Sequence, residues 1–280
     1  MLEKSLISGF ADEIDSAFDV QLGVLESLGQ KYIELRAADG IGIVDFTMDK
    51  AKEIKEKMDA CGIAVSAIGS PIGKIGINDE FEPHFEKYKH IVELAHYFET
   101  PNIRMFSFYL PDENLPEKYR DKVMERMEKL VDYAKQEAVT LLHENEKGIY
   151  GAMAKECRIL MDEFYGENFK CIFDFANYVQ CKQDTKEAYE LLKDYIAYIH
   201  VKDAVWGTGE VVLPGTGDGN LRYIFNELDK KGFCGFLSLE PHLFHFQGFD
   251  ALERGETEDK KETDGVRAYK AAYASLKRIL

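Results

Sequence analysis

The sequence predicts an α/β protein with a single-domain (β/α)8 barrel, also called a TIM barrel, and three observations support this fold class. Short apolar runs alternate with amphipathic helical runs through all 280 residues, giving eight β/α units. Regular alternation of this kind indicates parallel strands covered by helices. Four successive apolar runs end on a side chain that can bind a metal, and the strands of such barrels carry chemistry at their carboxyl ends. We therefore expect one domain over residues 1–280.

In the first half of the chain, four apolar runs read as strands, and each is followed by a run with helical periodicity. The predicted strands span residues 5–10, 32–36, 64–68 and 103–109. Apolar side chains then recur at helical spacing over residues 18–28, 48–60, 81–95 and 119–138. Gly29 and Gly62 follow the first two of these runs, and a glycine just after a helix is a common stop signal.

The second half repeats the pattern. Its predicted strands end at Glu144, Asp174, His200 and Glu240, and its predicted helices cover about residues 152–164, 185–195, 221–231 and 266–280. The alternative to a closed barrel is a doubly wound open sheet, which normally has a glycine-rich first turn. The turn after the first strand reads Gly-Phe-Ala-Asp-Glu and lacks that pattern. Eight units therefore favour closure into a barrel.

Two connections in the second half are longer than the fold requires. Residues 203–220 contain the only tryptophan, Trp206, and a Gly-Thr-Gly-Asp-Gly run at 215–219. Residues 241–265 begin with aromatic and histidine side chains and finish as a charged stretch. Long loops in compact domains are more often functional than decorative. The glycine run is compatible with either a phosphate-binding loop or a plain turn before a helix. The loop of residues 241–265 is expected to act as a lid over a small polar ligand.

Composition narrows the function class. The formal net charge of −16 argues against nucleic acid or an anionic membrane as partner, because phosphates attract a basic face. No apolar stretch approaches the roughly 18 residues of a membrane span, and the first residues lack the apolar core of a signal peptide. Five cysteines are scattered without metal-type spacing. These features predict a cytoplasmic protein.

The four strand endings of the second half carry the chemistry. They read Thr-Leu-Leu-His-Glu144, Cys-Ile-Phe-Asp174, Tyr-Ile-His200 and Leu-Ser-Leu-Glu240. Each alone could be a solvated loop acid, a turn cap or a core histidine. A buried acid is costly unless it is paired or bound to a metal, and three carboxylates with one imidazole suit a divalent ion. Together the endings predict a metal site, whereas His143 should point to the other face of its strand.

The residues around these endings carry a family resemblance. They are His-Glu-Asn-Glu-Lys, Phe-Asp-Phe-Ala-Asn, His-Val-Lys-Asp and Leu-Glu-Pro-His. The chain resembles, over essentially its whole length, the xylose isomerase-like TIM-barrel superfamily and its sugar phosphate isomerase/epimerase branch. That branch includes ketose 3-epimerases and inosose dehydratases. The resemblance implies one divalent ion, foremost manganese, with magnesium, cobalt or zinc as alternatives. Its implied ligands are Glu144, Asp174, His200 and Glu240, and the two glutamates double as acid and base.

The resemblance also suggests substrate contacts. Lys202 resembles the family's substrate-contacting lysine, and Glu34 resembles a second-strand glutamate beneath the pocket. Ketose 3-epimerases place a histidine where this chain has Asn177, which can donate to a hydroxyl but cannot take up a proton. His242 follows Glu240 on the same face, and Trp206 can stack on a sugar. The expected substrate-binding residues are therefore Lys202, Asn177, His242, Glu34 and Trp206.

The activity implied is metal-dependent isomerisation or epimerisation of a sugar or sugar derivative, by proton transfer through an enediolate. Three alternatives remain open. One is a metal-dependent lyase or dehydratase similar to inosose dehydratase, and another is a C-glycoside-cleaving subunit that needs a partner chain. The third is a catalytically silent sugar-binding barrel. The expected partner is a small-molecule sugar, and self-association of the chain is left open.

Overall fold

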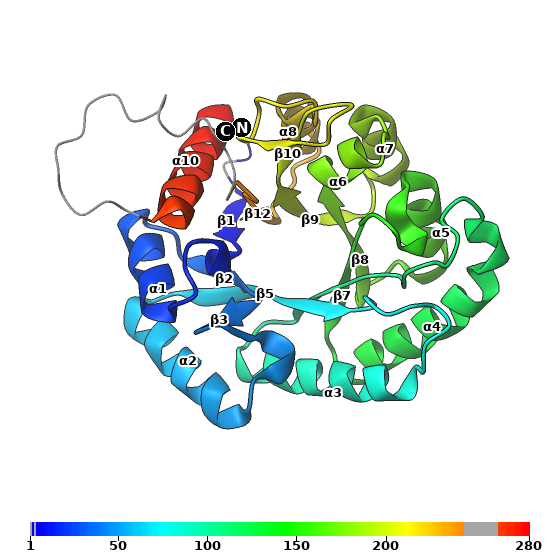
Figure 1. Ribbon diagram of the computed structural model, residues 1–280, viewed down its shortest axis with the longest axis horizontal. Coiled ribbons are helices and arrows are strands. Elements are labelled where there is room, and N and C mark those ends of the chain that lie inside the picture. Colours follow the sequence, from blue (N-terminus) through cyan, green and yellow to red (C-terminus); the bar gives the residue numbers. More distant parts are fainter. Residues whose placement is uncertain (1, 3, 244–262) are drawn as a thin grey trace.

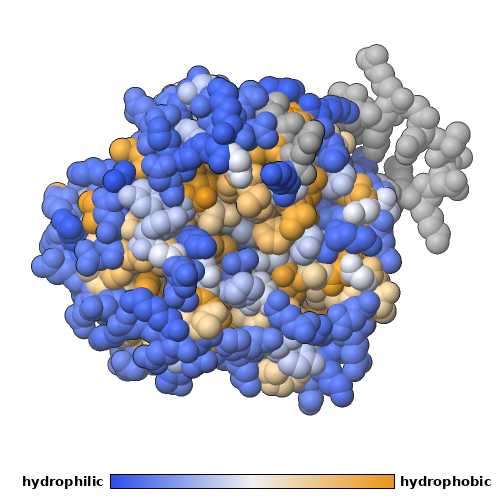
Figure 2. Space-filling model, turned by 180° about the vertical axis from the view of Figure 1, so that it is seen from behind, coloured by the Kyte–Doolittle hydropathy of each residue, from blue (hydrophilic) through white to orange (hydrophobic). Residues whose placement is uncertain are grey.

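The predicted barrel is confirmed. The computed structural model describes residues 2, 4–243 and 263–280. Within these residues, eight parallel strands form one sheet in the order β1-β12-β9-β8-β7-β6-β5-β2. The first and last strands of this order, β1 and β2, also contact each other, so the sheet is a nearly closed barrel. The helices surround the barrel (Figure 1). Seen from behind, hydrophilic residues dominate the rim of the molecule and hydrophobic ones gather toward the centre (Figure 2).

All eight predicted strands are present. They are β1 (Leu6–Gly9), β2 (Tyr32–Leu35), β5 (Ala64–Ile72), β6 (Asn102–Met105), β7 (Thr140–Glu144), β8 (Phe169–Asp174), β9 (Ile196–Val201) and β12 (Phe236–Leu239). Strand β5 runs further than expected and β6 ends earlier. The register between these two strands shifts after Ile68. Phe108 has a φ of 66°, a left-handed conformation that cannot continue a strand.

The predicted helices are also present. They are α1 (Phe18–Ser27), α2 (Met48–Cys61), α3 (Glu82–Tyr97), α4 (Arg120–Gln136), α5 (Ala154–Phe164), α7 (Thr185–Leu192), α8 (Leu221–Lys230) and α10 (Asp264–Ile279). The Thr47 side chain accepts a hydrogen bond from the Lys50 amide at the start of α2, and Gly62 ends this helix in the left-handed conformation. No helix among the described residues is long and apolar enough to cross a bilayer.

Several short elements lie outside the predicted pattern. They are the hairpins β3 (Ala37–Ala38) with β4 (Ile41–Gly42) and β10 (Asp203–Ala204) with β11 (Val211–Val212), the helix α6 (Phe175–Gln180), and the 3-10 helices η1 (Ala11–Glu13), η2 (Ile43–Asp45), η3 (Pro116–Lys118) and η4 (Tyr150–Ala152). Such segments are too short for a helical or strand periodicity to register. Most of them follow the carboxyl ends of barrel strands, so they shape the mouth of the barrel.

Strand alternation puts an apolar layer directly beneath the strand ends. Leu142, Ile172 and Tyr198 belong to one small buried cluster. Each lies two residues before Glu144, Asp174 or His200, and residues two apart share one face of a strand. The polar side chains at the strand ends therefore rest on a packed apolar floor inside the barrel.

The chain approaches itself closely where β5 and β6 end. Gly73 directly follows β5 and has a φ of 91°. A Cβ built on Gly73 would lie 1.9 Å from the carbonyl oxygen of Phe106. The Phe106 amide donates to the Ile72 carbonyl at 2.7 Å, and the Phe108 amide donates to the Gly73 carbonyl at 3.0 Å. Only glycine fits both the backbone conformation and the space at position 73.

We therefore expect Gly73→Ala to lower the free energy of unfolding by about 2 kcal/mol or more, from strain and the contact with Phe106. The matched control is Gly23→Ala, in the exposed part of α1 with no atom within 4 Å of the added Cβ. That change should raise the free energy by about 0.5–1 kcal/mol, because alanine favours a helix interior. Urea unfolding monitored by circular dichroism measures both. Equal shifts of the same sign would contradict this account of position 73.

Candidate metal centre and active site

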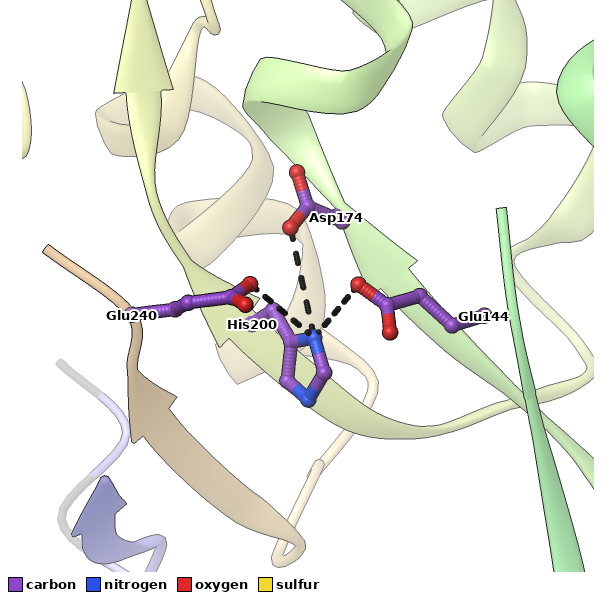
Figure 3. Close-up of side chains that lie close together, drawn as sticks. All are labelled: Glu144, Asp174, His200 and Glu240. Carbon is purple, nitrogen blue, oxygen red and sulfur yellow. Dashed lines mark hydrogen bonds and ion pairs between the residues drawn. The ribbon is translucent and has the colours of Figure 1, made fainter. Parts of the chain in front are cut away.

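Four side chains at the carboxyl ends of neighbouring strands converge on one point. Glu144 ends β7, Asp174 ends β8, His200 lies near the end of β9, and Glu240 directly follows β12. One ligand atom from each lies within 4.8 Å of the others, and all four residues are buried. Figure 3 shows Glu144 and Glu240 pointing inward from opposite sides, with Asp174 and His200 between them. The structure thus brings together the four residues that the sequence singles out.

The imidazole of His200 is held between carboxylates on both sides. Its Nδ1 lies 2.9 Å from Glu144 Oε1, 3.6 Å from Glu240 Oε2 and 3.9 Å from Asp174 Oδ2. Its Nε2 lies 3.1 Å from Glu34 Oε2. Burial lowers the pKa of His200, but Glu144 and Glu34 more than offset this and raise the pKa well above its usual value. The cluster therefore favours a positive charge next to Nδ1.

Glu34 determines which nitrogen of His200 faces the cluster. This carboxylate is fully buried and receives a hydrogen bond of 2.6 Å from Ser238 Oγ. A neutral imidazole that donates its Nε2 proton to Glu34 keeps an unprotonated Nδ1. The lone pair of Nδ1 is then available to a metal among the three other acids. A carboxylate behind a histidine is the usual arrangement that orients a metal-binding imidazole.

Two cations balance part of the negative charge. Lys202 Nζ is buried and lies 2.9 Å from Glu240 Oε2 and 3.0 Å from Asp174 Oδ2. Arg104 Nη1 lies 3.2 Å from Glu144 Oε2 and 3.9 Å from Glu240 Oε1, so it sits between the two glutamates. The sequence reasoning missed Arg104. Its signal was a charged residue inside an otherwise apolar strand, which is rare unless the charge is paired.

The three carboxyl groups of the cluster differ in their pKa. Burial raises the pKa of Glu144, but His200 and Arg104 outweigh it and bring the value to about 2. Burial is likewise outweighed at Glu240, where Lys202 and His200 hold the pKa well below its usual value. At Asp174 burial dominates over Lys202, and the pKa rises to about 7. Both glutamates are thus ionised at neutral pH, and Asp174 still lacks sufficient positive charge nearby.

The residues present fit a divalent metal ion. The Oδ2 atom of Asp174 is buried and accepts no hydrogen bond from any described residue. Its contact with Lys202 is an ion pair without hydrogen-bond geometry. Ligand atoms that lie about 2.0–2.2 Å from an ion are at most about 4.4 Å apart, close to the spread within this cluster. Three carboxylates and one imidazole suit manganese, magnesium, cobalt or zinc.

Arg36, a second residue that sequence reasoning missed, anchors the outer side of Glu240. Its Nη1 lies 3.3 Å from Glu240 Oε1, its Nε 2.7 Å from Asp12 and its Nη2 3.2 Å from Glu13. Glu13, Glu240 and His242 also lie close enough together to hold an ion. The guanidinium of Arg36 already supplies the positive charge between the two glutamates. Arg36 ends a predicted strand, so its position was visible in the sequence but its partners were not.

The predicted substrate contacts lie at different depths. Asn177 Nδ2 lies 3.4 Å from Glu144 Oε1, so Asn177 joins Lys202 inside the cluster. Glu34 contacts His200 from beneath and has no exposed surface. His242 lies at the edge, with Nε2 3.5 Å from Glu13 Oε1. Trp206 is 48% exposed, and no hydrogen bond among the described residues joins it to the cluster.

The glycine run after β9 is folded around an internal carboxylate. The amides of Gly215 and Gly217 both donate to Asp203 Oδ2 at 2.9 Å, and the Gly219 amide donates to Oδ1 at 2.9 Å. These are the amides that a phosphate cradle would use. The phosphate interpretation is therefore wrong for this loop, because the carboxylate of Asp203 already accepts the hydrogen bonds that a phosphate would accept. The proposed lid largely lies outside the described residues, since residues 244–262 are not described.

A cavity of about 510 Å³ adjoins Glu240 at the mouth of the barrel. Its lining includes the polar side chains of Arg36, Arg104, Lys74 and Glu146 and the apolar side chains of Ile43, Val44 and Pro71. Sites for small molecules commonly measure about 300–1,000 Å³ and combine apolar walls with a few polar groups. The cavity and the four-residue cluster therefore form one candidate active site for a small molecule.

Solved structures share this fold. The probable 3-DHS dehydratase AsbF from Bacillus anthracis is 18% identical, with a TM-score of 0.69 over 84% of this chain and 92% of that one. The 3-keto-D-glucoside 4-epimerase YcjR from E. coli is 15% identical, with a TM-score of 0.67 over 99% and 98%. The IOLI protein with a bound zinc atom is 15% identical, with a TM-score of 0.74 over 98% and 97%. No curated protein matches the chain in sequence.

At these identities the structural likeness establishes the fold and no more. The family is shown by a sequence model. The family model described as xylose isomerase-like TIM barrel matches residues 22–271, which is most of the chain. The match includes all eight strands except β1 and contains the four converging residues. The protein therefore belongs to the xylose isomerase-like TIM-barrel family.

Proposed function

We propose that the protein is a metal-dependent isomerase or epimerase that moves a carbon-bound proton of a sugar or sugar derivative through an enediolate. The observation that carries this proposal is the pair of buried glutamates, Glu144 and Glu240, which enter the cluster from opposite sides (Figure 3). A divalent ion held by these glutamates with Asp174 and His200 would act as a Lewis acid toward a carbonyl oxygen. Manganese is the first candidate, and magnesium, cobalt or zinc would also suit the ligands.

The proposed proton transfer uses this chain's own carboxylates. One ionised glutamate takes a proton from the carbon next to the carbonyl. In an isomerisation the same glutamate returns that proton to the neighbouring carbon. In an epimerisation the opposite glutamate, after taking up a proton from water, delivers it to the other face of the same carbon. Asn177 cannot replace either group, because an amide does not take up a proton. Lys202 and Arg104 lie against the same glutamates. They place fixed positive charge where negative charge develops on the substrate, which lowers the barrier.

A dehydratase is the second candidate. The similarity to a probable 3-DHS dehydratase supports it, because elimination begins with the same removal of a proton next to a carbonyl. Loss of a hydroxyl group from the next carbon then replaces the return of the proton. The two activities differ in their product, since only elimination releases water and forms a carbon–carbon double bond.

For the metal, we expect one divalent ion per chain in the purified protein. His200→Ala and Glu240→Gln should each reduce the bound metal to about a tenth or less, because each removes one of four ligands. His96→Ala, an exposed histidine on α3 away from the cluster, is the control and should keep the full metal content. Elemental analysis after dialysis measures the content. Full occupancy in both ligand variants would rule out the proposed site.

For the orientation of His200, we expect Glu34→Gln to weaken metal binding by about 10- to 100-fold, as is typical when the group behind a metal-binding histidine is changed. Glu156→Gln alters another buried glutamate, on α5, and should leave the affinity unchanged. Competition with a chelator of known affinity gives both dissociation constants, and circular dichroism verifies folding. Unchanged metal affinity in the Glu34 variant would contradict the orienting role.

For the chemistry, a true substrate incubated in deuterium oxide should gain deuterium next to its carbonyl, as seen by NMR. The exchange should require metal and fall by about 10²- to 10⁴-fold in Glu144→Gln, the usual contribution of a general acid or base. Glu156→Gln again serves as control. Isomerisation that leaves the product unlabelled would indicate a hydride shift and defeat the proposed proton transfer, even with the metal site established.

A further inference from the structure

We propose that the cavity beside Glu240 binds a carboxylate group of the substrate, so that the substrate is a sugar acid of monosaccharide size. This inference rests on the proposed function, because it fills the same active site. The cavity measures about 510 Å³ and faces three cationic side chains, Arg36, Lys74 and Arg104. A ligand can bind only to those cations whose donors are not already paired with protein acceptors.

Arg36 is already committed to protein carboxylates. Each of its three nitrogens faces a different acid, namely Asp12 at 2.7 Å, Glu13 at 3.2 Å and Glu240 at 3.3 Å. An arginine surrounded in this way fixes the position of Glu240. It offers little to an incoming anion.

Arg104 has an unused donor. Its Nη1 faces Glu144, and its Nη2 donates to the Gly69 carbonyl at 3.2 Å. Its Nε is buried and has no hydrogen-bond partner among the described residues, and only 6% of the side chain is exposed. Buried polar groups in folded proteins are nearly always paired. Arg104 lines the cavity, and a small turn of its side chain toward the cavity would bring this unpaired N–H to a ligand.

The guanidinium of Arg104 is also held in place. Its Cζ lies 4.8 Å from the centroid of the Phe10 ring and 5.2 Å from that of Phe106. Contacts with two rings restrict the plane of the guanidinium, which fixes the direction of its remaining N–H toward a charged acceptor. A carboxylate is such an acceptor, and charge-assisted bonds of arginine to carboxylates are among the strongest in proteins.

Lys74 supplies a second positive charge beside the same ring. Its Nζ lies 4.2 Å from the Phe106 centroid and 3.1 Å from Glu146 Oε2. Its side chain is 30% exposed, and an ion pair that water reaches is weak. Lys74 can therefore turn from Glu146 to a ligand at small cost. One free N–H and one ammonium suit the two oxygens of a carboxylate better than the three oxygens and double charge of a phosphate.

Titration calorimetry with matched probes on the metal-containing protein tests this. D-Glucuronate and D-galacturonate differ from D-glucose and D-galactose by a carboxylate in place of a hydroxymethyl group. We expect at least one uronate to bind about 10- to 100-fold more tightly than its neutral partner, the range of a hydrogen bond to a charged group. Arg104→Gln should abolish this preference, and Lys74→Gln should reduce it.

Two variants serve as controls. Arg126 is another buried arginine beside two phenylalanine rings, on α4, and Lys89 is another lysine over a phenylalanine ring, on α3. Arg126→Gln and Lys89→Gln should keep the uronate preference. If Arg104→Gln fails to fold, Lys74→Gln decides the outcome, because Lys74 is partly exposed and lies outside the barrel strands.

Four results would overturn the inference. They are no measurable uronate binding, equal affinity for uronate and neutral sugar, an unchanged preference in folded Arg104→Gln and Lys74→Gln proteins, and tighter binding of D-glucose 6-phosphate than of either uronate. Deuterium exchange on a neutral ketose without any uronate preference would refute this inference and leave the proposed function intact. A uronate preference that depends on Arg104, without deuterium exchange in any sugar, would support this inference and contradict the proposed function.

Discussion

The structure depends on the balance of charge at the mouth of the barrel. Three carboxylates and an imidazole lie buried together there, and such a group is unstable unless positive charge compensates it. Lys202 and Arg104 provide part of this charge, and the raised pKa of Asp174 indicates that part is missing. A divalent ion would supply the remainder.

The sequence predicts the barrel and the four converging residues because both follow from strand alternation. A residue that ends a parallel strand on the inward face must lie near the residues that end its neighbours. Glu144, Asp174 and His200 satisfy this rule, and the residues two positions earlier form the apolar floor. The position of Glu34 was implied only by the family resemblance, and the structure places its carboxylate against His200.

Pairing between distant residues could not be predicted in this way. The sequence shows Arg36 and Arg104 as charges in or beside strands, but only the structure shows which carboxylates they meet. The role of the glycine run, as a phosphate cradle or a plain turn, could not be decided from the sequence for a related reason. Its backbone amides can bind any anion. Whether that anion is a ligand or a nearby aspartate depends on where side chains lie in the fold, and a short sequence motif does not show this. Short segments such as α6 were not predicted because six residues are too few for a helical periodicity to be recognised.

The role of Asp203 has a consequence for how this barrel can diversify. Within four residues at the end of β9 the chain carries His200, Lys202 and the aspartate that collects the glycine amides. The loop after β9 is therefore attached to this strand at both of its ends, where it leaves the strand and where residues 215–219 return to Asp203. The hairpin between these two attachments can lengthen or shorten without moving either. Insertions there would alter the mouth of the barrel while the strand ends keep their geometry.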